Sequence, residues 1–121
     1  MSGTSQAVNL AETLAQFSER WAPRTVATYN GHDVMVVKVD GEFTWHSHPD
    51  SDDFFLVLKG ELDIELRDRV VRLRPGEMFV VQKGVEHRPA ARTGEVEILL
   101  IEPTGAPNTG DPATAARRIV I

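Results

Sequence analysis

Three of the four histidines in this chain stand where their imidazoles could bind one metal ion. His46 and His48 are separated by one residue in a run with the pattern of a strand. Because residues i and i+2 of a strand point to the same face, roughly 7 Å apart along the chain, the two rings can converge on one point. His87 follows a turn at Gly84, where the chain can fold back toward the pair. Imidazole nitrogen is a common ligand of transition metals, so this spacing predicts a metal site.

The elements that must position these histidines are short strands. Turn dipeptides such as Asn30-Gly31 and Lys59-Gly60 separate runs rich in apolar, β-branched residues. Within these runs, positions expected to be buried alternate with positions expected to be solvent-exposed. About eight such runs, with no second helical pattern between them, predict an all-β fold, an antiparallel sandwich or barrel. The expected strands cover residues 26–29, 33–39, 42–48, 54–58, 61–67, 70–73, 78–81 and 96–101.

A short helix is expected before the strands. Asn9 and Glu12 fit a capping box, in which each side chain binds a free N–H of the first turn. Apolar residues then recur at the spacing of one helical stripe: Leu10, Leu14, Phe17 and Trp21. This pattern predicts a helix of roughly 10–12 residues that Pro23 ends. We expect its stripe to be buried on the outer face of the barrel or on a neighbouring copy of the chain.

The chain is expected to hold one domain with two flanking segments, since 121 residues are a common domain size. The domain is the barrel (24–102), and the flanking segments are an N-terminal tail with the short helix (1–23) and an extended C-terminal tail (103–121). The C-terminal tail carries three of the seven prolines, which favours an extended path over the surface. Its last residues, 119–121, are apolar enough to add to a sheet edge.

The composition excludes several classes of function. A formal net charge of −5 makes a nucleic-acid partner unexpected. The absence of cysteine excludes a disulfide scaffold, a thiolate zinc site and a cysteine nucleophile. The sequence has no apolar run approaching 18 residues and no basic, apolar leader, so we expect neither a membrane span nor a signal peptide. The expected location is the cytoplasm.

The first histidine pair and its neighbours resemble the first motif of the cupin superfamily, G-x5-H-x-H-x3,4-E-x6-G. Gly41, His46, His48 and Gly60 match this motif, although four residues rather than five separate Gly41 from His46. Asp53 occupies the glutamate position, with the motif's six residues between it and Gly60.

The segment around the third histidine resembles the second cupin motif, G-x5-P-x-G-x2-H-x3-N. Gly76, Gly84 and His87 match it. Gln82 stands in the proline position and Ala91 in the asparagine position.

The cupin resemblance implies a double-stranded β-helix, or jelly roll, with metal ligands at His46, His48, Asp53 and His87. Aspartate is one methylene shorter than the glutamate of the motif, which leaves the carboxylate ligand open between Asp53 and its neighbour Asp52. A site of three histidines without a carboxylate is a further alternative, and the superfamily also contains that pattern. The implied cofactor is a divalent transition metal (Fe, Mn, Zn, Ni or Cu). The implied partner is a small-molecule substrate or ligand, and the resemblance favours a homodimer.

Strand alternation places further residues on the face of the ligands. The pocket candidates are Thr44, Phe55, Val57, Met78 and Val80. Glu97 or Glu102, near the last strand of the barrel, could lie at the mouth of the pocket. Trp45 alternates outward, and His32 is expected on the surface.

Three functions compete on these grounds. The first is a metal-dependent enzyme on a small organic or sugar-type molecule, either dioxygenase-like or an isomerase or lyase, and the apolar pocket candidates favour oxygen chemistry. The second is a non-catalytic module that binds a metal or small ligand. The third is a metal-free cupin enzyme that uses side chains alone.

Overall fold

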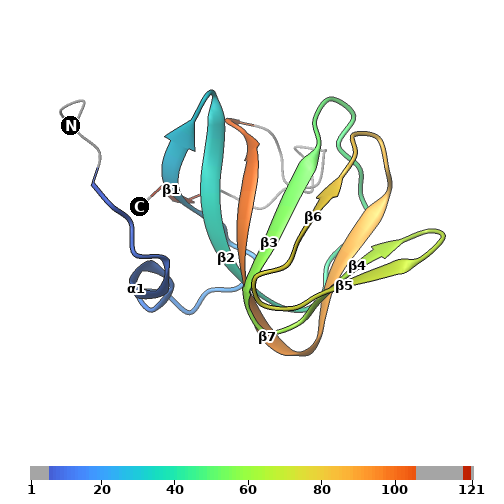
Figure 1. The fold of residues 1–121 in the computed structure, drawn as a ribbon, viewed down its shortest axis with the longest axis horizontal. Helices are drawn as coiled ribbons and strands as arrows, with labels where there is room; N and C mark the ends of the chain where they lie inside the picture. Colours follow the sequence, from blue (N-terminus) through green and yellow to red (C-terminus); the bar gives the residue numbers. More distant parts are fainter. Residues whose placement is uncertain (1–5, 106–118, 121) are drawn as a thin grey trace.

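The computed structural model describes residues 6–105 and 119–120 of the chain. In this part a short helix, α1 (Leu10–Leu14), lies beside a set of strands (Figure 1). The strands are β1 (Arg24–Tyr29), β2 (His32–Glu42), β3 (Asp53–Lys59), β4 (Leu62–Leu66), β5 (Val70–Leu73), β6 (Met78–Val81), β7 (His87–Pro103) and β8 (Ile119–Val120). Among the described residues, no helix is long and apolar enough to cross a membrane.

The long strand β7 connects the two halves of the sheet. Its second half pairs with β2 on one side and β3 on the other, so that Leu100 lies opposite both Met35 and Phe55. Its first half pairs with β4, where Pro89 lies opposite Ile64. Strands β6 and β5 extend the sheet beyond β3 and β4. Because β7 changes partners midway, the sheet folds over into two layers (Figure 1), and the predicted all-β antiparallel jelly roll with one short helix is confirmed.

Apolar side chains from the inner faces of the two layers form the core. Met35, Leu62 and Ile64 have no exposed surface, and burial of such a side chain contributes about 1.5–3 kcal/mol. Along β3 the buried residues alternate with half-buried ones, as the two-residue period of a strand requires. Asp53 and Phe55 belong to the buried set. Strand β3 therefore presents a carboxylate to the interior.

The helix is shorter than the sequence predicts. It ends at Leu14, so Phe17 and Trp21 lie outside it. A longer helix would need the N–H of Trp21 to donate to the carbonyl of Phe17, four residues earlier. Instead, the Trp21 N–H donates to the carbonyl of Lys38 at 2.8 Å, and Nζ of Lys38 donates to the Phe17 carbonyl at 2.6 Å. Contacts with β2 replace the helical bond, and the prediction of one continuous helical stripe is wrong.

The strand predicted over residues 42–48 is also not formed. Strand β2 ends at Glu42, and in the following segment only His46 makes an isolated bridge, to His87. The N–H of Phe43 donates to the carbonyl of Pro89 at 2.9 Å, but proline has no N–H with which to donate back. The ladder is therefore interrupted between Phe43 and His46.

The apolar end of the chain adds to a sheet edge, as the sequence predicts. Ile119 and Val120 pair in parallel with Arg24 and Thr25 of β1. The rest of the expected C-terminal tail, residues 106–118 and 121, lies outside the described residues.

The turn between β3 and β4 requires glycine at position 60 for two reasons. Its φ is +87°, in the region that favours glycine. A Cβ at this position would lie 3.0 Å from the carbonyl oxygen of Glu95 and 3.1 Å from Cγ2 of Val96. Gly76 offers a matched control, because its φ is +85° but no atom lies within 4 Å of its Cβ position.

We expect Gly76→Ala to lower the free energy of unfolding by about 1–2 kcal/mol, the cost of a side chain in the left-handed region. Gly60→Ala should lower it by about 1–3 kcal/mol more, because the added methyl group also overpacks the turn. Urea denaturation followed by circular dichroism measures both values. Equal midpoints for the two variants would contradict a steric requirement at Gly60.

Candidate metal centre

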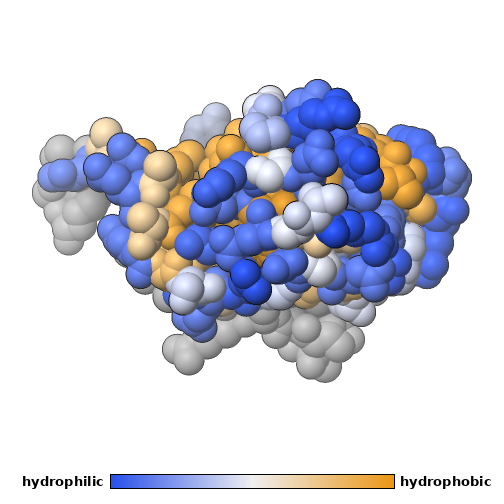
Figure 2. Space-filling model, turned by 90° about the horizontal axis from the view of Figure 1, so that it is seen from below, coloured by the Kyte–Doolittle hydropathy of each residue, from blue (hydrophilic) through white to orange (hydrophobic). Residues whose placement is uncertain are grey.

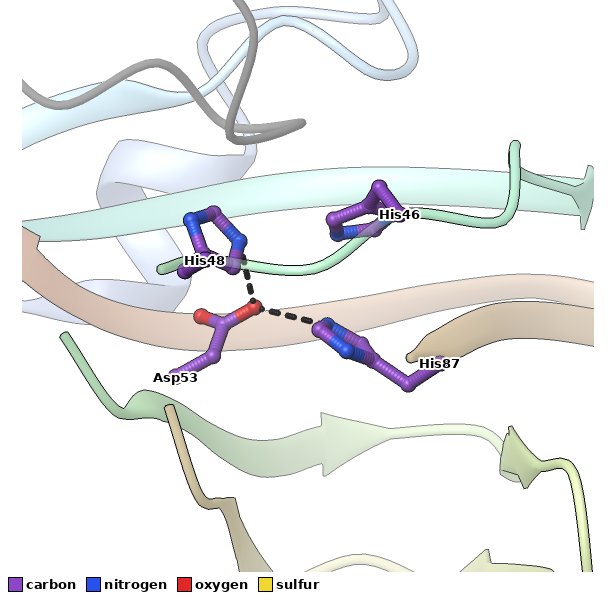
Figure 3. A group of neighbouring side chains, drawn as sticks. All are labelled: His46, His48, Asp53 and His87. Carbon is purple, nitrogen blue, oxygen red and sulfur yellow. Dashed lines mark hydrogen bonds and ion pairs between the residues drawn. The ribbon is translucent and has the colours of Figure 1, made fainter. Parts of the chain in front are cut away.

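Four buried side chains converge in the interior of the jelly roll (Figure 3). His46, His48, Asp53 and His87 each offer one ligand atom, and these atoms all lie within 4.8 Å of one another. Oδ2 of Asp53 lies 3.2 Å from Nε2 of His48 and 3.1 Å from Nε2 of His87. The structure therefore brings together the four residues that the sequence singled out as candidate ligands.

Backbone hydrogen bonds hold the two histidine segments against each other. The N–H of His46 donates to the carbonyl of His87 at 3.0 Å, and the N–H of His87 donates to the carbonyl of His46 at 2.9 Å. The N–H of Gly84 donates to the carbonyl of His48 at 2.7 Å. Three backbone bonds thus fix the imidazoles in place although residues 43–48 form no regular strand.

The orientation of two imidazoles is set by backbone carbonyls. Nδ1 of His46 lies 2.8 Å from the carbonyl oxygen of Thr44, and Nδ1 of His87 lies 2.9 Å from that of Val85. A carbonyl oxygen only accepts, so each Nδ1 carries a proton and donates it. In a neutral ring the lone pair is then on Nε2, which is the arrangement that metal-binding histidines adopt.

The contacts around Asp53 fit a divalent cation. With Nδ1 of a neutral His87 protonated, Nε2 and the carboxylate oxygen are both acceptors, so their approach to 3.1 Å is favourable only with a proton or cation between them. Nε2 of His48 is buried with no hydrogen bond, which a metal ion would satisfy. Ligand atoms about 2.0–2.1 Å from one ion lie about 2.8–3.4 Å apart at angles of 90–109°. The contacts of Asp53 match this separation.

Electrostatics favour the charge states that a metal requires. Burial lowers the pKa of His46 to about 4, so near neutral pH its ring is uncharged and keeps a lone pair. For Asp53, burial is the largest influence and raises the pKa. Contacts with His48, His87 and Glu102 together outweigh burial and bring the pKa of this carboxyl well below its usual range. Asp53 therefore offers a carboxylate charge and His46 a neutral imidazole nitrogen.

The alternative carboxylate lies elsewhere. Asp52 is exposed, and its Oδ1 accepts a hydrogen bond from the N–H of Lys83 at 2.9 Å. His32, predicted on the surface, is half-buried on β2 away from the four-residue group, and its Nδ1 lies 2.9 Å from the carbonyl oxygen of Asn30. Trp45 stacks on the guanidinium of Arg67, 3.8 Å from the ring centre. None of these side chains joins the candidate metal centre.

A small, mostly apolar cavity adjoins the candidate metal centre. Its volume is about 40 Å³, room for two or three waters. The lining residues are Trp21, Val37, Val39, Phe43, His46, Asp53, Phe55, Pro89, Ile98, Leu100 and Glu102. His46 and Asp53 thus connect the candidate metal centre to a cavity with apolar walls.

Of the pocket candidates from the sequence, Phe55 lines this cavity. Val57 is fully buried in the core, whereas Thr44 and Met78 are exposed and Val80 lines a separate hollow beside Leu66 and Val85. The placement of Thr44 rested on strand alternation through residues 42–48, and no strand forms there. Residue Met78, on edge strand β6, alternates to the outer face.

The sequence reasoning did not assign several lining residues to the pocket. Val37, Val39, Ile98 and Leu100 come from β2 and β7, whose pairing across the sheet is not visible in local periodicity. Glu102, one of two glutamates considered for the mouth, lines the cavity and is 3% exposed, whereas Glu97 does not line it.

The fold and this site define a class of protein. Residues 33–102 match the family model described as the Cupin domain, which is more than half of the chain, so the chain belongs to the cupin family.

Individual proteins also resemble the chain. It is 35% identical over 85 residues to the uncharacterized protein YdbB of Bacillus subtilis (strain 168), covering 69% of this chain and 75% of YdbB. It is 34% identical over 80 residues to protein SchB of Streptomyces halstedii, covering 65% of this chain and 57% of SchB, little more than half of that protein. The crystal structure of a cupin-2 domain containing protein from Shewanella frigidimarina superposes with a TM-score of 0.77 at 44% identity, covering 79% of this chain and 93% of that one.

Removal of one imidazole should release the metal without unfolding the chain. We expect His87→Ala to lower Zn²⁺ affinity by more than the 10–100-fold that follows loss of a group supporting a ligand. The sheet spectrum in circular dichroism should persist, because the apolar core does not depend on a metal. Zinc retained after gel filtration, measured by atomic emission, is the readout, and His32→Ala is the control. Equal zinc content in both variants would contradict the assignment.

The two neighbouring aspartates allow a matched test of the carboxylate. Asp53→Asn keeps the shape of a side chain that touches two imidazoles but removes its charge, so we expect a loss of Zn²⁺ affinity similar to that of His87→Ala. Asp52→Asn should bind Zn²⁺ within a few-fold of the parent, because Asp52 only accepts a backbone N–H. Isothermal calorimetry compares the two. A loss of only about 10–100-fold in Asp53→Asn would instead make Asp53 a support for another ligand.

Proposed function

We propose that this cupin is a metal-dependent enzyme that acts on a small organic molecule, with dioxygenase-like chemistry as the first candidate. The observation that carries the proposal is the buried group His46, His48, Asp53 and His87, of which His46 and Asp53 also line an apolar cavity. A metal centre beside an apolar cavity suits a reaction in which a mostly apolar substrate is held out of water.

His46, His48, Asp53 and His87 would hold the ion. An iron, manganese or copper ion supplies redox chemistry with dioxygen at such a site, and zinc or nickel supplies Lewis acidity. The protein's own contribution is to fix the imidazoles through the carbonyls of Thr44 and Val85 and to exclude water from the cavity. Phe55, whose ring lies 6.0 Å from that of His87, contributes an apolar wall of the cavity.

Glu102 favours a second candidate, an isomerase or lyase on a small organic or sugar-type substrate. Its carboxyl lines the cavity and is 3% exposed, so it could move a proton on a bound molecule. The remaining alternative is a non-catalytic module that binds a metal or a small ligand in the same cavity. In each case we propose a cytoplasmic homodimer, which the cupin resemblance favours.

The test is turnover by protein loaded anaerobically with Fe²⁺, Mn²⁺ or Zn²⁺. Diketones, catechols, hydroxy acids and sugars are supplied with air, and oxygen uptake and products are measured by electrode and mass spectrometry. We expect oxygen uptake with the iron form and one of the apolar substrates, lost in His87→Ala and retained in His32→Ala.

The outcomes separate the candidates. Product formed by the zinc form without oxygen, and lost in Glu102→Gln, would replace the dioxygenase with the isomerase or lyase. A metal-loaded protein that binds members of the panel but converts none would establish the binding module. Turnover that survives loss of the metal would reject the metal-dependent proposal altogether.

A further inference from the structure

The cavity beside the candidate metal centre is too small for an organic ring. Its volume is about 40 Å³, room for two or three waters. Pockets that hold a drug-sized molecule commonly measure about 300–1,000 Å³, and the separate hollow beside Leu66 and Val85 measures about 480 Å³. The cavity therefore suits a reactant of two or three atoms, and the organic substrate of the proposed function needs room elsewhere.

The walls of the cavity are formed mostly by the apolar inner face of one sheet. Val37 and Val39 come from β2, and Ile98 and Leu100 come from β7. Val37 lies opposite Ile98, and Leu100 lies opposite Phe55 of β3, so these side chains share one face of the sheet. All five residues are at most 8% exposed. A water molecule gains no hydrogen bond from any of these side chains.

Two carboxyls are the acidic groups of the lining, Asp53 and Glu102. Oδ2 of Asp53 lies 3.2 Å from Nε2 of His48 and 3.1 Å from Nε2 of His87, and Glu102 interacts with the same carboxylate. Oδ1 of Asp53 is buried without a hydrogen bond, so it can accept one from a water. Because a buried water needs about two to four polar partners, we expect hydration beside these carboxyls and a dry space along the apolar wall.

Trp21 closes one side of the cavity from the segment between α1 and β1. Its ring stacks on Phe43, another lining residue, with the ring centres 4.8 Å apart and the planes 14° apart. Its φ is +60°, in a region that a bulky residue disfavours, and its N–H and indole Nε1–H donate to the carbonyls of Lys38 and Asp40. Such strain persists only where contacts hold it, and it clusters at functional sites. The chain thus accepts an unfavourable backbone conformation at a residue that keeps water from the apolar wall.

Leaving the space open also costs stability. Atoms around a void lose packing contacts, so an unfilled cavity weakens a core. Isoleucine in place of Val37 or Val39 would add one methyl group to the lining and fill part of the space. Proteins keep such losses where function needs them. A dry void that reaches His46 and Asp53 is therefore suited to a small apolar reactant of the neighbouring centre.

We propose that this cavity is a binding site for dioxygen. Dioxygen has two atoms, carries no charge and needs no hydrogen bond, so it matches both the volume and the walls of the cavity. The valines of β2, the aliphatic side chains of β7 and Phe55 would hold it by packing, without help from a metal. The inference deepens the proposed function and rests on it, since it gives the smaller substrate of an oxygenase a place of its own beside the candidate metal centre.

Methyl NMR of the isoleucines tests the site directly. Xenon, an apolar probe of similar size, and dioxygen are each dissolved under pressure in the metal-free and the zinc-loaded protein. Ile98 lines the cavity and is 1% exposed, whereas Ile64 is fully buried and does not line it, so Ile64 reports background access. We expect xenon to shift the Ile98 methyl resonance and dioxygen to relax it about threefold or more strongly than that of Ile64, because dry apolar cavities bind such gases.

Two neighbouring valines of β2 offer a matched pair of variants. Val37 lines the cavity, whereas Val36 is fully buried on the opposite face of the strand. Val37→Ile should reduce the xenon response of Ile98 to that of Ile64 without lowering the midpoint of urea denaturation, because the added methyl group fills a void. Val36→Ile should leave the xenon response unchanged and lower the midpoint, because it overpacks a filled site. Val39→Ile repeats the filling of the cavity with a second lining residue.

Three results would overturn the proposal. They are equal responses of Ile98 and Ile64 to both gases in the parent, a xenon response that survives in both Val37→Ile and Val39→Ile, and cross-relaxation of the Ile98 methyl with a bound water.

Failure of this inference can be told from failure of the proposed function, because gas binding is measured without turnover. Equal responses of the two isoleucines, together with oxygen uptake by the iron form, would remove the dioxygen site and leave the proposed function. A response confined to Ile98, with no oxygen uptake by any metal form, would remove the dioxygenase and leave the cavity as a site for dioxygen.

Discussion

The candidate metal centre depends on one backbone interaction, the reciprocal hydrogen bonds between His46 and His87. These bonds hold together two segments that are far apart in the sequence and place their imidazoles on one side. The carbonyls of Thr44 and Val85 then fix both rings, so that each Nε2 faces inward. The orientation of the histidine side chains therefore follows from backbone pairing and requires no regular strand at residues 43–48.

Burial of Asp53 is the second constraint. A carboxylate at 2% exposure is costly unless cations or donors surround it. Nε2 of His48 and Nε2 of His87 lie 3.2 Å and 3.1 Å from its Oδ2, and a divalent cation bound between these atoms would supply the compensating charge. His46 is buried as well, which lowers its pKa to about 4 and keeps its ring neutral near neutral pH. The site is thus a compact polar group beside an apolar core, and Figure 2 shows hydrophilic side chains over much of the outer face seen from below.

The N-terminal segment shows how tertiary contacts override a local pattern. Leu10, Leu14, Phe17 and Trp21 have helical spacing, yet the helix stops at Leu14 because Lys38 binds both Phe17 and Trp21. The rings of the last two are used differently. Phe17 packs under the guanidinium of Arg24, 4.4 Å from its centre, and Trp21 reaches the cavity. The stripe predicted as one packing surface is thus divided among three environments.

The sequence by itself determined the all-β class, the glycine turns and the residue types able to bind a metal, because strand alternation and turn chemistry act over a few residues. The spacing between Asp53 and Gly60 identified Asp53 as a candidate ligand. In the structure Asp53 is buried at the start of β3, whereas Asp52 accepts a hydrogen bond from the N–H of Lys83. Only the tertiary structure decided the cavity. Its walls come from β2, β3, β7, the segment of Phe43 and His46 between β2 and β3, and a residue before the first strand, and their meeting depends on pairings between distant segments. No local periodicity contains those pairings, since a side chain's neighbours across a sheet are set by register rather than by its own segment.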